Sequence, residues 1–158
     1  MTETPKLAFI GLGVMGGPMT GHLARAGHRV TAYNRSAERA AKWRAVWEDE
    51  GLEVTFVRTP AGAAHGAKVV FTCVGNDDDL AAVTLGEEGV LAGLAEGALL
   101  VDHTTTSAAM ARELGAACAA RGIGFLDAPV SGGQAGAQNG KLAVMCGGSD
   151  EDMARARP

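Results

Sequence analysis

Two clusters of glycine residues give this chain a means of binding anions with its main chain. The first, Gly11-x-Gly13-x-x-Gly16, directly follows the apolar segment "LAFI". The second lies in "SGGQAGAQNG", which begins at Ser131. Because each glycine increases the backbone entropy that is lost on folding, such clusters indicate main chain that must turn tightly or approach a ligand closely.

The first cluster lies between a predicted strand, residues 6–11, and a predicted helix, residues 18–27. A dinucleotide-binding fingerprint requires this placement. Gly11 would permit the tight turn, Gly13 would let a pyrophosphate approach the main chain, and Gly16 would let helix and strand pack closely. The N-terminus of the helix would attract the pyrophosphate. A turn without a ligand is the alternative. The predicted phosphate loop comprises Gly11, Leu12, Gly13, Val14, Met15 and Gly16.

The sequence "YNRS" at the end of the next predicted strand bears on the choice of dinucleotide. NAD enzymes usually carry an acidic residue about 20 positions after the glycines, which accepts the ribose hydroxyls. Here the neutral Asn34 stands 18 residues after Gly16, and Arg35 follows it. A planar guanidinium suits a phosphate, so Asn34, Arg35 and the adjoining Ser36 predict that NADP is preferred, with NAD still possible. The alternative is that Arg35 is a solvated surface residue.

The second cluster is suited to a carboxylate. Ser131, Gly132 and Gly133 offer a hydroxyl and closely spaced main-chain N–H groups, and successive N–H groups of this kind form concave anion sites. The cluster therefore predicts a small partner that bears a carboxylate.

The segments "FIGLGVMGGPM" and "DAPVSGGQAGAQNGKLAVMCGG" together resemble the β-hydroxyacid dehydrogenases, the family of 3-hydroxyisobutyrate dehydrogenase. The resemblance covers essentially the whole chain, as the N-terminal cofactor domain of that family. It implies that Val74 and Gly75 lie beside the cofactor ribose and that Thr105 lies near the nicotinamide. It also implies that residues 131–133 hold the substrate carboxylate. Imine reductases and 6-phosphogluconate dehydrogenases resemble these segments less well.

The resemblance implies an NAD(P)-dependent oxidoreductase, which transfers hydride between C4 of the nicotinamide and a small 3-hydroxy acid or its semialdehyde. In this family a lysine acts as the base, with an asparagine nearby, on a long helix after the cofactor domain. The sequence ends at Pro158, and Lys141 does not match that lysine.

We therefore expect residues 1–158 to form one dinucleotide-binding domain without the family's C-terminal helical domain. We expect no catalytic residue in this chain, no dehydrogenase activity from it alone, and a homo-oligomer at full length. The alternative is a non-catalytic module that binds NADP or another protein.

Composition limits the other classes of function. The 158 residues are 47% hydrophobic and 20% charged, which is typical of one globular domain. A net charge of −4 without a basic stripe argues against nucleic acid as a partner. No apolar run is long enough to span a membrane, and "MTETPK" does not resemble a secretory signal. Three widely spaced cysteines predict buried, reduced thiols in a cytoplasmic protein.

Strand-like and helix-like segments alternate along the chain. This order predicts an α/β, doubly wound Rossmann fold with a mostly parallel sheet in a single domain. A glycine-rich loop is expected between the last two strands. Predicted strands cover residues 6–11, 28–34, 52–57, 68–74, 98–102, 124–130 and 141–148; predicted helices cover residues 18–27, 36–51, 59–67, 80–94 and 107–121, with a further polar helix beginning near residue 149.

Several other residues could have a functional role, but a structural role is the simpler interpretation of each. Asp77, Asp78 and Asp79 could bind a metal, yet we expect them to cap the helix that follows, so that no metal site is predicted. His103 could contact the substrate, although a loop histidine without a catalytic part is the simpler prediction. Trp43 and Trp47 stand four residues apart, so they should share one helix face and pack on the sheet.

Overall fold

The computed structural model describes residues 4–158. Within them, six parallel strands form one sheet in the order β3-β2-β1-β4-β5-β6. The strands of this sheet are β1 (Lys6–Ile10), β2 (Arg29–Tyr33), β3 (Val54–Phe56), β4 (Val69–Thr72), β5 (Leu99–Asp102) and β6 (Gly124–Asp127). The helices are α1 (Gly16–Arg25), α2 (Ala37–Asp49), α3 (Pro60–Ala64), α4 (Asp77–Leu85), α5 (Val90–Gly93), α6 (Ala108–Ala120), α7 (Gly133–Gln138) and α8 (Asp150–Ala156).

The strand order reverses at β1. From β1 the chain runs outward through β2 and β3, and it then returns to the other side of β1 and continues through β4, β5 and β6. A doubly wound sheet of this kind is the predicted Rossmann fold. In such sheets ligands bind outside the carboxyl ends of the strands, at the point of reversal. Here that point lies between β1 and β4.

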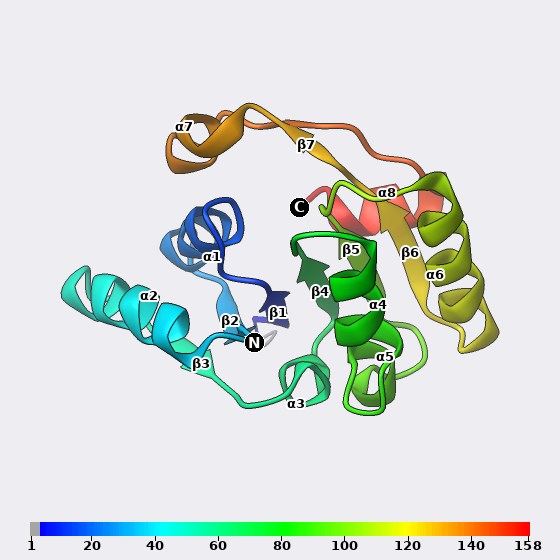
Figure 1. The fold of residues 1–158 in the computed structure, drawn as a ribbon, viewed down its shortest axis with the longest axis horizontal. Helices are drawn as coiled ribbons and strands as arrows, with labels where there is room; N and C mark the ends of the chain where they lie inside the picture. Colours follow the sequence, from blue (N-terminus) through cyan, green and yellow to red (C-terminus); the bar gives the residue numbers. More distant parts are fainter. Residues whose placement is uncertain (1–3) are drawn as a thin grey trace.

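Helices cover both faces of the sheet (Figure 1). On one face, Ala8 and Ile10 of β1 belong to a buried cluster with residues of α3, α4, α5 and α6. On the other face, α2 packs through Trp47, which is buried with Leu12. Met153 of α8 packs on the same sheet through β5 and β6. The sheet is therefore the middle layer of three, as its apolar strands predict.

Short polar side chains cap the N-termini of three helices at the positions that the sequence predicts. The hydroxyl of Ser36 accepts from the N–H of Arg39 at the start of α2, and Thr59 and Ser107 cap α3 and α6 in the same way. Gly27 adopts a φ of +93° beyond α1, which suits glycine after a helix end. These boundaries agree with the sequence-based prediction.

The predicted helix over residues 80–94 is wrong in its bounds, because two helices occupy that segment. α4 begins earlier, at Asp77, and α5 begins at Val90. Between them, a Cβ on Gly86 would lie 2.5 Å from the carbonyl oxygen of Ala82. The main chain therefore folds back tightly at a position that only glycine can occupy.

The acidic residues at the start of α4 do not act as its cap. Asn76 is the cap, and its side chain accepts from the N–H of Asp79. Asp77 instead accepts hydrogen bonds from the hydroxyl and the N–H of Ser107, at 2.6 and 3.0 Å, and these bonds lower the pKa of its carboxyl. Asp77 therefore joins the start of α4 to the start of α6. Residues 4–158 contain no group of three or more His, Cys, Asp or Glu that could hold a metal ion.

The segment after β6 differs most from the prediction. A short helix, α7, replaces part of the expected loop, and the strand expected over residues 141–148 is reduced to β8 (Ala143–Val144). β8 pairs antiparallel with β7 (Val130–Ser131) in a sheet of its own. Figure 1 shows this β7–β8 segment, residues 130–144, crossing the end of the molecule above α1.

The prediction of buried cysteines is confirmed only in part. Cys118 is a buried thiol as predicted, but Cys73 is only partly buried and Cys146 is exposed. Cys146 lies just after the short β8, outside any strand. No helix among the described residues is long and apolar enough to cross a membrane.

Candidate functional site

A cavity of about 930 Å³ lies at the point of strand reversal. Its lining comes from the loop between β1 and α1, from the end of β2, and from the loop between β4 and α4. The structure thus brings three segments of the predicted cofactor site to one place. The predicted residues in the lining are Gly11, Gly13, Val14, Met15, Gly16, Asn34, Arg35, Ser36, Val74 and Gly75.

The three glycines of the first cluster differ in what surrounds them. A Cβ on Gly11 would lie 2.1 Å from the carbonyl oxygen of Cys73, and a Cβ on Gly16 would lie 1.8 Å from that of Gly11. Gly11 also has a φ of +102°. By contrast, the nearest atom to a Cβ on Gly13 would be an Nη of Arg39, 3.7 Å away. Gly11 and Gly16 therefore permit the close packing of the loop, while Gly13 keeps its surface open.

The open part of the loop presents unpaired main-chain donors. Within residues 4–158, the N–H groups of Gly13, Val14 and Met15 donate to no protein acceptor. They lie immediately before α1, where the helix dipole adds positive potential. The open surface at Gly13 and these N–H groups fit the pyrophosphate of a dinucleotide.

Leu12 and Asn34 position this loop and do not present side-chain donors to the cavity. The buried Leu12 donates its N–H to Oδ1 of Asn34 at 2.9 Å, and its carbonyl oxygen accepts from the indole of Trp43 at 2.9 Å. The amide nitrogen of Asn34 in turn donates to the carbonyl oxygen of Ser36. The predicted site residues Leu12 and Asn34 thus hold the phosphate loop against β2 and α2.

Two arginines line the cavity beside the end of β2. Arg35 donates from Nη1 to Oδ1 of Asp79 at 3.0 Å, and its side chain is 80% exposed. Arg39, on the first turn of α2, makes no ion pair within residues 4–158. Arg39 is not among the cofactor residues predicted from the sequence. Its position four residues after Arg35, in the turn that Ser36 caps, was the signal that could have identified it.

The loop after β4 is held by a buried polar network. The N–H of Val74 donates to the hydroxyl of Thr104, and the N–H of Thr104 donates to Oδ1 of Asp102, both at 3.0 Å. Asp102 also accepts from the hydroxyl of Thr72 at 2.8 Å. The predicted residue Thr105 is exposed and lies outside the cavity lining. Its neighbour Thr104 is therefore the threonine that supports the cavity.

Burial governs the ionisation of Asp102. The carboxyl is inaccessible to solvent, and this desolvation raises its pKa, with the nearby charge of Asp127 acting in the same direction. The hydrogen bonds from Thr104 and Thr72 oppose the shift without cancelling it. In the described residues, Oδ2 of Asp102 and Oδ1 of Asp127 are buried without a hydrogen-bond partner. The two residues are aligned on neighbouring strands, so the structure brings two carboxyls together at this edge.

His103 belongs to the core and not to an exposed loop. Its Nδ1 lies 2.8 Å from the carbonyl oxygen of Ala128, and its ring stacks on that of Phe71. Burial lowers the pKa of the imidazole, which favours the neutral ring. His103 therefore joins the ends of β5 and β6.

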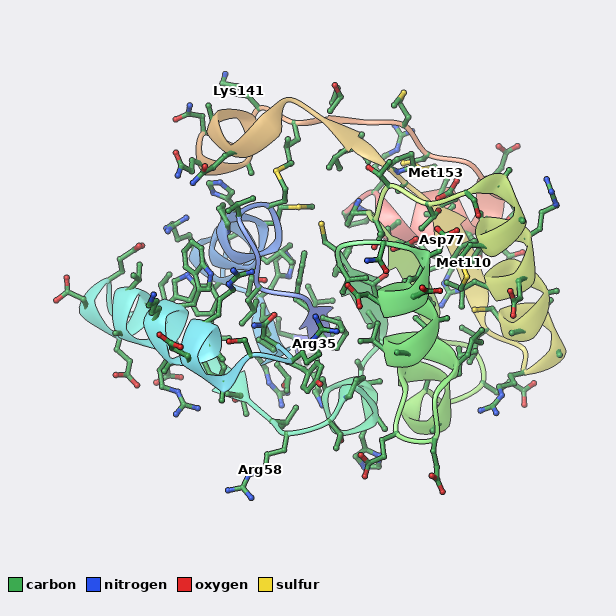
Figure 2. The ribbon with its side chains drawn as sticks, in the orientation of Figure 1. Arg35, Arg58, Asp77, Met110, Lys141 and Met153 are labelled. Carbon is green, nitrogen blue, oxygen red and sulfur yellow. The ribbon has the colours of Figure 1, made fainter. Side chains whose placement is uncertain are left out.

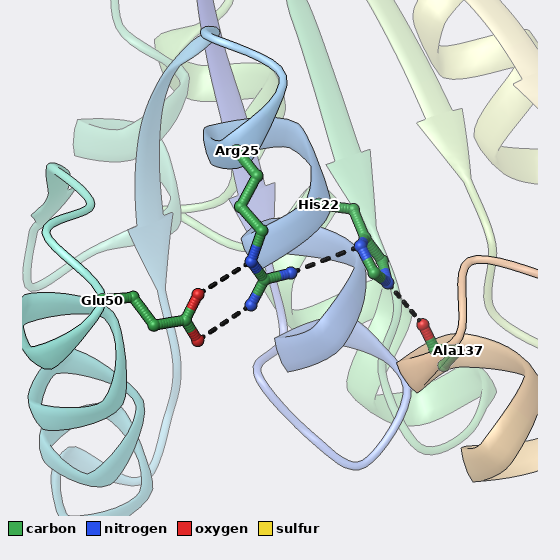
Figure 3. Close-up of polar contacts among 4 residues, drawn as sticks. All are labelled: His22, Arg25, Glu50 and Ala137. Carbon is green, nitrogen blue, oxygen red and sulfur yellow. Dashed lines mark hydrogen bonds and ion pairs between the residues drawn. The ribbon is translucent and has the colours of Figure 1, made fainter.

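The second glycine cluster lies outside the lining of the cavity. Ser131, Gly132 and Gly133 are exposed at the junction of β7 and α7, and both glycines have positive φ. This part of the chain is tied to the phosphate-loop helix, because Nε2 of His22 on α1 donates to the carbonyl oxygen of Ala137 on α7 (Figure 3). The structure therefore places the two predicted anion-binding clusters on two helices that contact each other.

Residues 6–158 match the family described as the NAD binding domain of 6-phosphogluconate dehydrogenase. The chain belongs to this family. An uncharacterized oxidoreductase of Shewanella frigidimarina is 55% identical to it over 153 residues, which are 97% of this chain and 51% of that protein. The 3-hydroxyisobutyrate dehydrogenase of Pseudomonas aeruginosa is 38% identical over 155 residues, or 96% of this chain and 49% of that protein.

Solved structures of the family share the fold. The 3-hydroxyisobutyrate dehydrogenase of Mycobacterium tuberculosis matches with a TM-score of 0.88 and 35% identity, over 99% of this chain and 50% of that one. These relatives confirm the predicted resemblance to 3-hydroxyisobutyrate dehydrogenases and the dinucleotide-binding fold. The chain spans about half the length of the relatives that it matches.

Proposed function

We propose that this chain binds NADP in preference to NAD, as the cofactor-binding half of a dehydrogenase that acts on small 3-hydroxy acids. The observation that carries the proposal is the cavity at the strand reversal, where unpaired N–H groups adjoin two arginines. The N–H groups of residues 13–15 suit the pyrophosphate, and Arg35 and Arg39 suit a phosphate on the ribose.

The remaining cofactor contacts follow from the same arrangement. Val74 and Gly75, which line the cavity, are proposed to lie beside the cofactor ribose, and Thr105, on the loop after β5, is proposed to lie near the nicotinamide. When bound, the nicotinamide supplies a carbon that accepts or donates hydride. The preference for NADP is part of the proposal, because structures of this fold are known with either dinucleotide: the protein Psf3 with NADP+ and a variant of the imine reductase of Myxococcus stipitatus with NAD+.

The exposed cluster Ser131, Gly132 and Gly133 is proposed to hold the carboxylate of the substrate. The positive φ angles of the two glycines turn the main chain before α7, which suits a concave group of N–H donors. Support comes from the M. tuberculosis enzyme, whose structure was solved with L-serine, a small carboxylate. The lysine that acts as base in such dehydrogenases is proposed to come from outside residues 1–158.

A titration of both dinucleotides against the purified chain tests the cofactor proposal. We expect a Kd for NADP at least about tenfold below that for NAD, since that ratio corresponds to about 1.4 kcal/mol, within the range of charged hydrogen bonds. Arg35→Ala should remove most of the difference, and Arg39→Ala should reduce it. Arg58→Ala is the matched control, because Arg58 points into solvent away from the cavity (Figure 2).

Equal affinity for the two dinucleotides, or unchanged NADP affinity in Arg35→Ala, would overturn the preference. The dehydrogenase part is tested with the protein expressed from its whole gene. We expect NADP reduction with 3-hydroxy acids, and loss of saturation by substrate in Ser131→Ala. Failure of a broad panel of 3-hydroxy acids and semialdehydes to support turnover would leave a dinucleotide-binding module.

A further inference from the structure

Asp79 is the acidic group that contacts the proposed phosphate-binding arginine. Its Oδ1 accepts from Nη1 of Arg35 at 3.0 Å, although the two residues are 44 positions apart in the sequence. Arg35 follows β2 and Asp79 lies on the first turn of α4, so the pair crosses the cavity between two walls. The ion pair of Arg35 and Asp79 is separate from the hydrogen bonds by which Asn34 and Trp43 hold Leu12.

The local structure directs the Asp79 carboxylate at the cavity. The first turn of α4 favours negative charge through the helix dipole. A Cβ on Gly75 would lie 3.0 Å from Oδ2 of Asp79, so the bare main chain at Gly75 leaves room for this carboxylate. Its side chain is only 28% exposed, whereas that of Arg35 is 80% exposed. Asp79 is therefore the better fixed partner, and Arg35 reaches over to it.

Other charges around the cavity do not contact Arg35 in this way. Glu87 and Glu88 also line it, from the loop between α4 and α5, and Arg39 lines it from α2. Among the described residues, Asp79 is the acidic group that is paired with an arginine of the cavity. A phosphate dianion that approached Arg35 would meet this carboxylate at hydrogen-bond distance from the same guanidinium.

We propose that Asp79 is a specificity-determining residue, which competes with the ribose phosphate of NADP for Arg35 and so limits the preference for NADP over NAD. This inference rests on the proposed function, because it takes Arg35 as the phosphate-binding residue. NAD lacks the phosphate and does not require Arg35, so the pair can stay intact when NAD binds. NADP must displace Asp79 from Arg35 before its phosphate can bind there.

The test is a titration of NADP and NAD against the chain and its Asp79→Asn variant. Asparagine has nearly the same shape but no charge. We expect the Kd for NADP to fall about fivefold while that for NAD stays within about twofold, since exposed pairs contribute up to about 1 kcal/mol. The gain should shrink at high salt, which screens exposed charges. Asp78→Asn is the matched control, because Asp78 is on the same helical turn but outside the cavity.

A double variant tests whether Asp79 acts through Arg35. In the Arg35→Ala background, Asp79→Asn should leave the Kd for NADP unchanged. The proposal is overturned if Asp79→Asn does not tighten NADP, if it tightens both dinucleotides equally, or if the gain persists without Arg35. Weaker NAD binding in Asp79→Asn would also overturn it and make Asp79 a ribose ligand. Failure of the proposed function is distinguishable, because the parent chain would then bind NADP and NAD equally.

Discussion

His22 joins the helix of the phosphate loop to the segment that carries the second glycine cluster, since its Nε2 lies 2.8 Å from the carbonyl oxygen of Ala137. The other ring nitrogen faces Nη1 of Arg25 at 3.3 Å, and Arg25 donates two further hydrogen bonds to Glu50 at the end of α2 (Figure 3). A guanidinium can only donate, so Nδ1 of His22 is the acceptor in its contact with Arg25 and Nε2 is the donor to Ala137.

Loss of this contact should loosen α7. In His22→Ala, we expect the amides of residues 133–140 to exchange with solvent about fivefold faster, because a net hydrogen bond contributes about 1 kcal/mol. Hydrogen exchange followed by mass spectrometry measures this effect. His65→Ala is the control, because His65 is exposed at the C-terminal end of α3 and does not contact α7 among the described hydrogen bonds. Identical exchange of the α7 amides in both variants would contradict the link.

Substitutions of two glycines in the predicted phosphate loop should have different effects: one on the stability of the fold and the other on NADP binding. A methyl group on Gly16 would lie 1.8 Å from a carbonyl oxygen, so Gly16→Ala should lower the free energy of unfolding by about 1–3 kcal/mol. Gly13→Ala should leave it within about 0.5 kcal/mol of the parent. Gly13→Ala should nevertheless weaken NADP binding about tenfold or more, because a methyl group would cover the open N–H surface. Urea denaturation and nucleotide titration measure the two effects, and tight NADP binding by Gly13→Ala would refute the assignment of the loop.

Asp102 should make stability depend on pH. Burial raises the pKa of its carboxyl in the folded state, so the folded chain holds this proton more tightly than the unfolded chain. The resulting stabilisation is present below the unfolded-state pKa and is lost as the pH rises through the folded-state pKa. Asp102→Asn cannot ionise and keeps an oxygen for Thr72 and Thr104.

The variant should therefore gain stability relative to the parent as the pH is raised from about 4 to about 8. Urea denaturation at several pH values measures the difference in the free energy of unfolding. Asp78→Asn, at an exposed position, should show no such trend. A difference between Asp102→Asn and the parent that is constant with pH would show that Asp102 is not the group that titrates.

Trp43 should anchor the phosphate loop more than its neighbour Trp47 does. Trp43→Phe removes the donor to the carbonyl oxygen of Leu12 and should destabilise the chain by about 1–2 kcal/mol, with weaker NADP binding as the loop is released. Trp47→Phe is the matched comparison, because the indole N–H of Trp47 is buried without a partner among the described residues. It should affect stability but leave the Kd for NADP unchanged. Equal effects on the Kd would exclude a special role for Trp43.

Sequence reasoning predicted the features that depend on local pattern. The placement of Gly11, Gly13 and Gly16 between strand and helix predicted the loop that lines the cavity. Ser36 and Ser107 marked the starts of α2 and α6, because capping depends on residues three apart. Alternating strands and helices predicted a parallel sheet, and the order of the strands follows from general rules of connection.

Features that depend on contacts between distant segments could not be predicted from the sequence. The pairing of Arg35 with Asp79 joins two loops that only the folded sheet brings together. The same is true of Thr104, which follows the neighbouring strand β5 and accepts a hydrogen bond from the N–H of Val74. The helix α7 is only 6 residues long and two of them are glycine, which lowers its helix propensity. Its contact with α1 through His22 and Ala137 joins segments that are distant in the sequence.

The place of β1 in the sheet has a consequence for synthesis on the ribosome. β1 leaves the exit tunnel before the other strands of this sheet, yet it lies in the interior of the sheet, paired with β2 on one side and β4 on the other. The chain up to Phe56 can form only the β3-β2-β1 half, with one edge of β1 unpaired. That edge is closed only when residues 69–72 have been made. A nascent chain of this protein therefore carries an open, apolar strand edge for some time, and such edges pair readily with other chains.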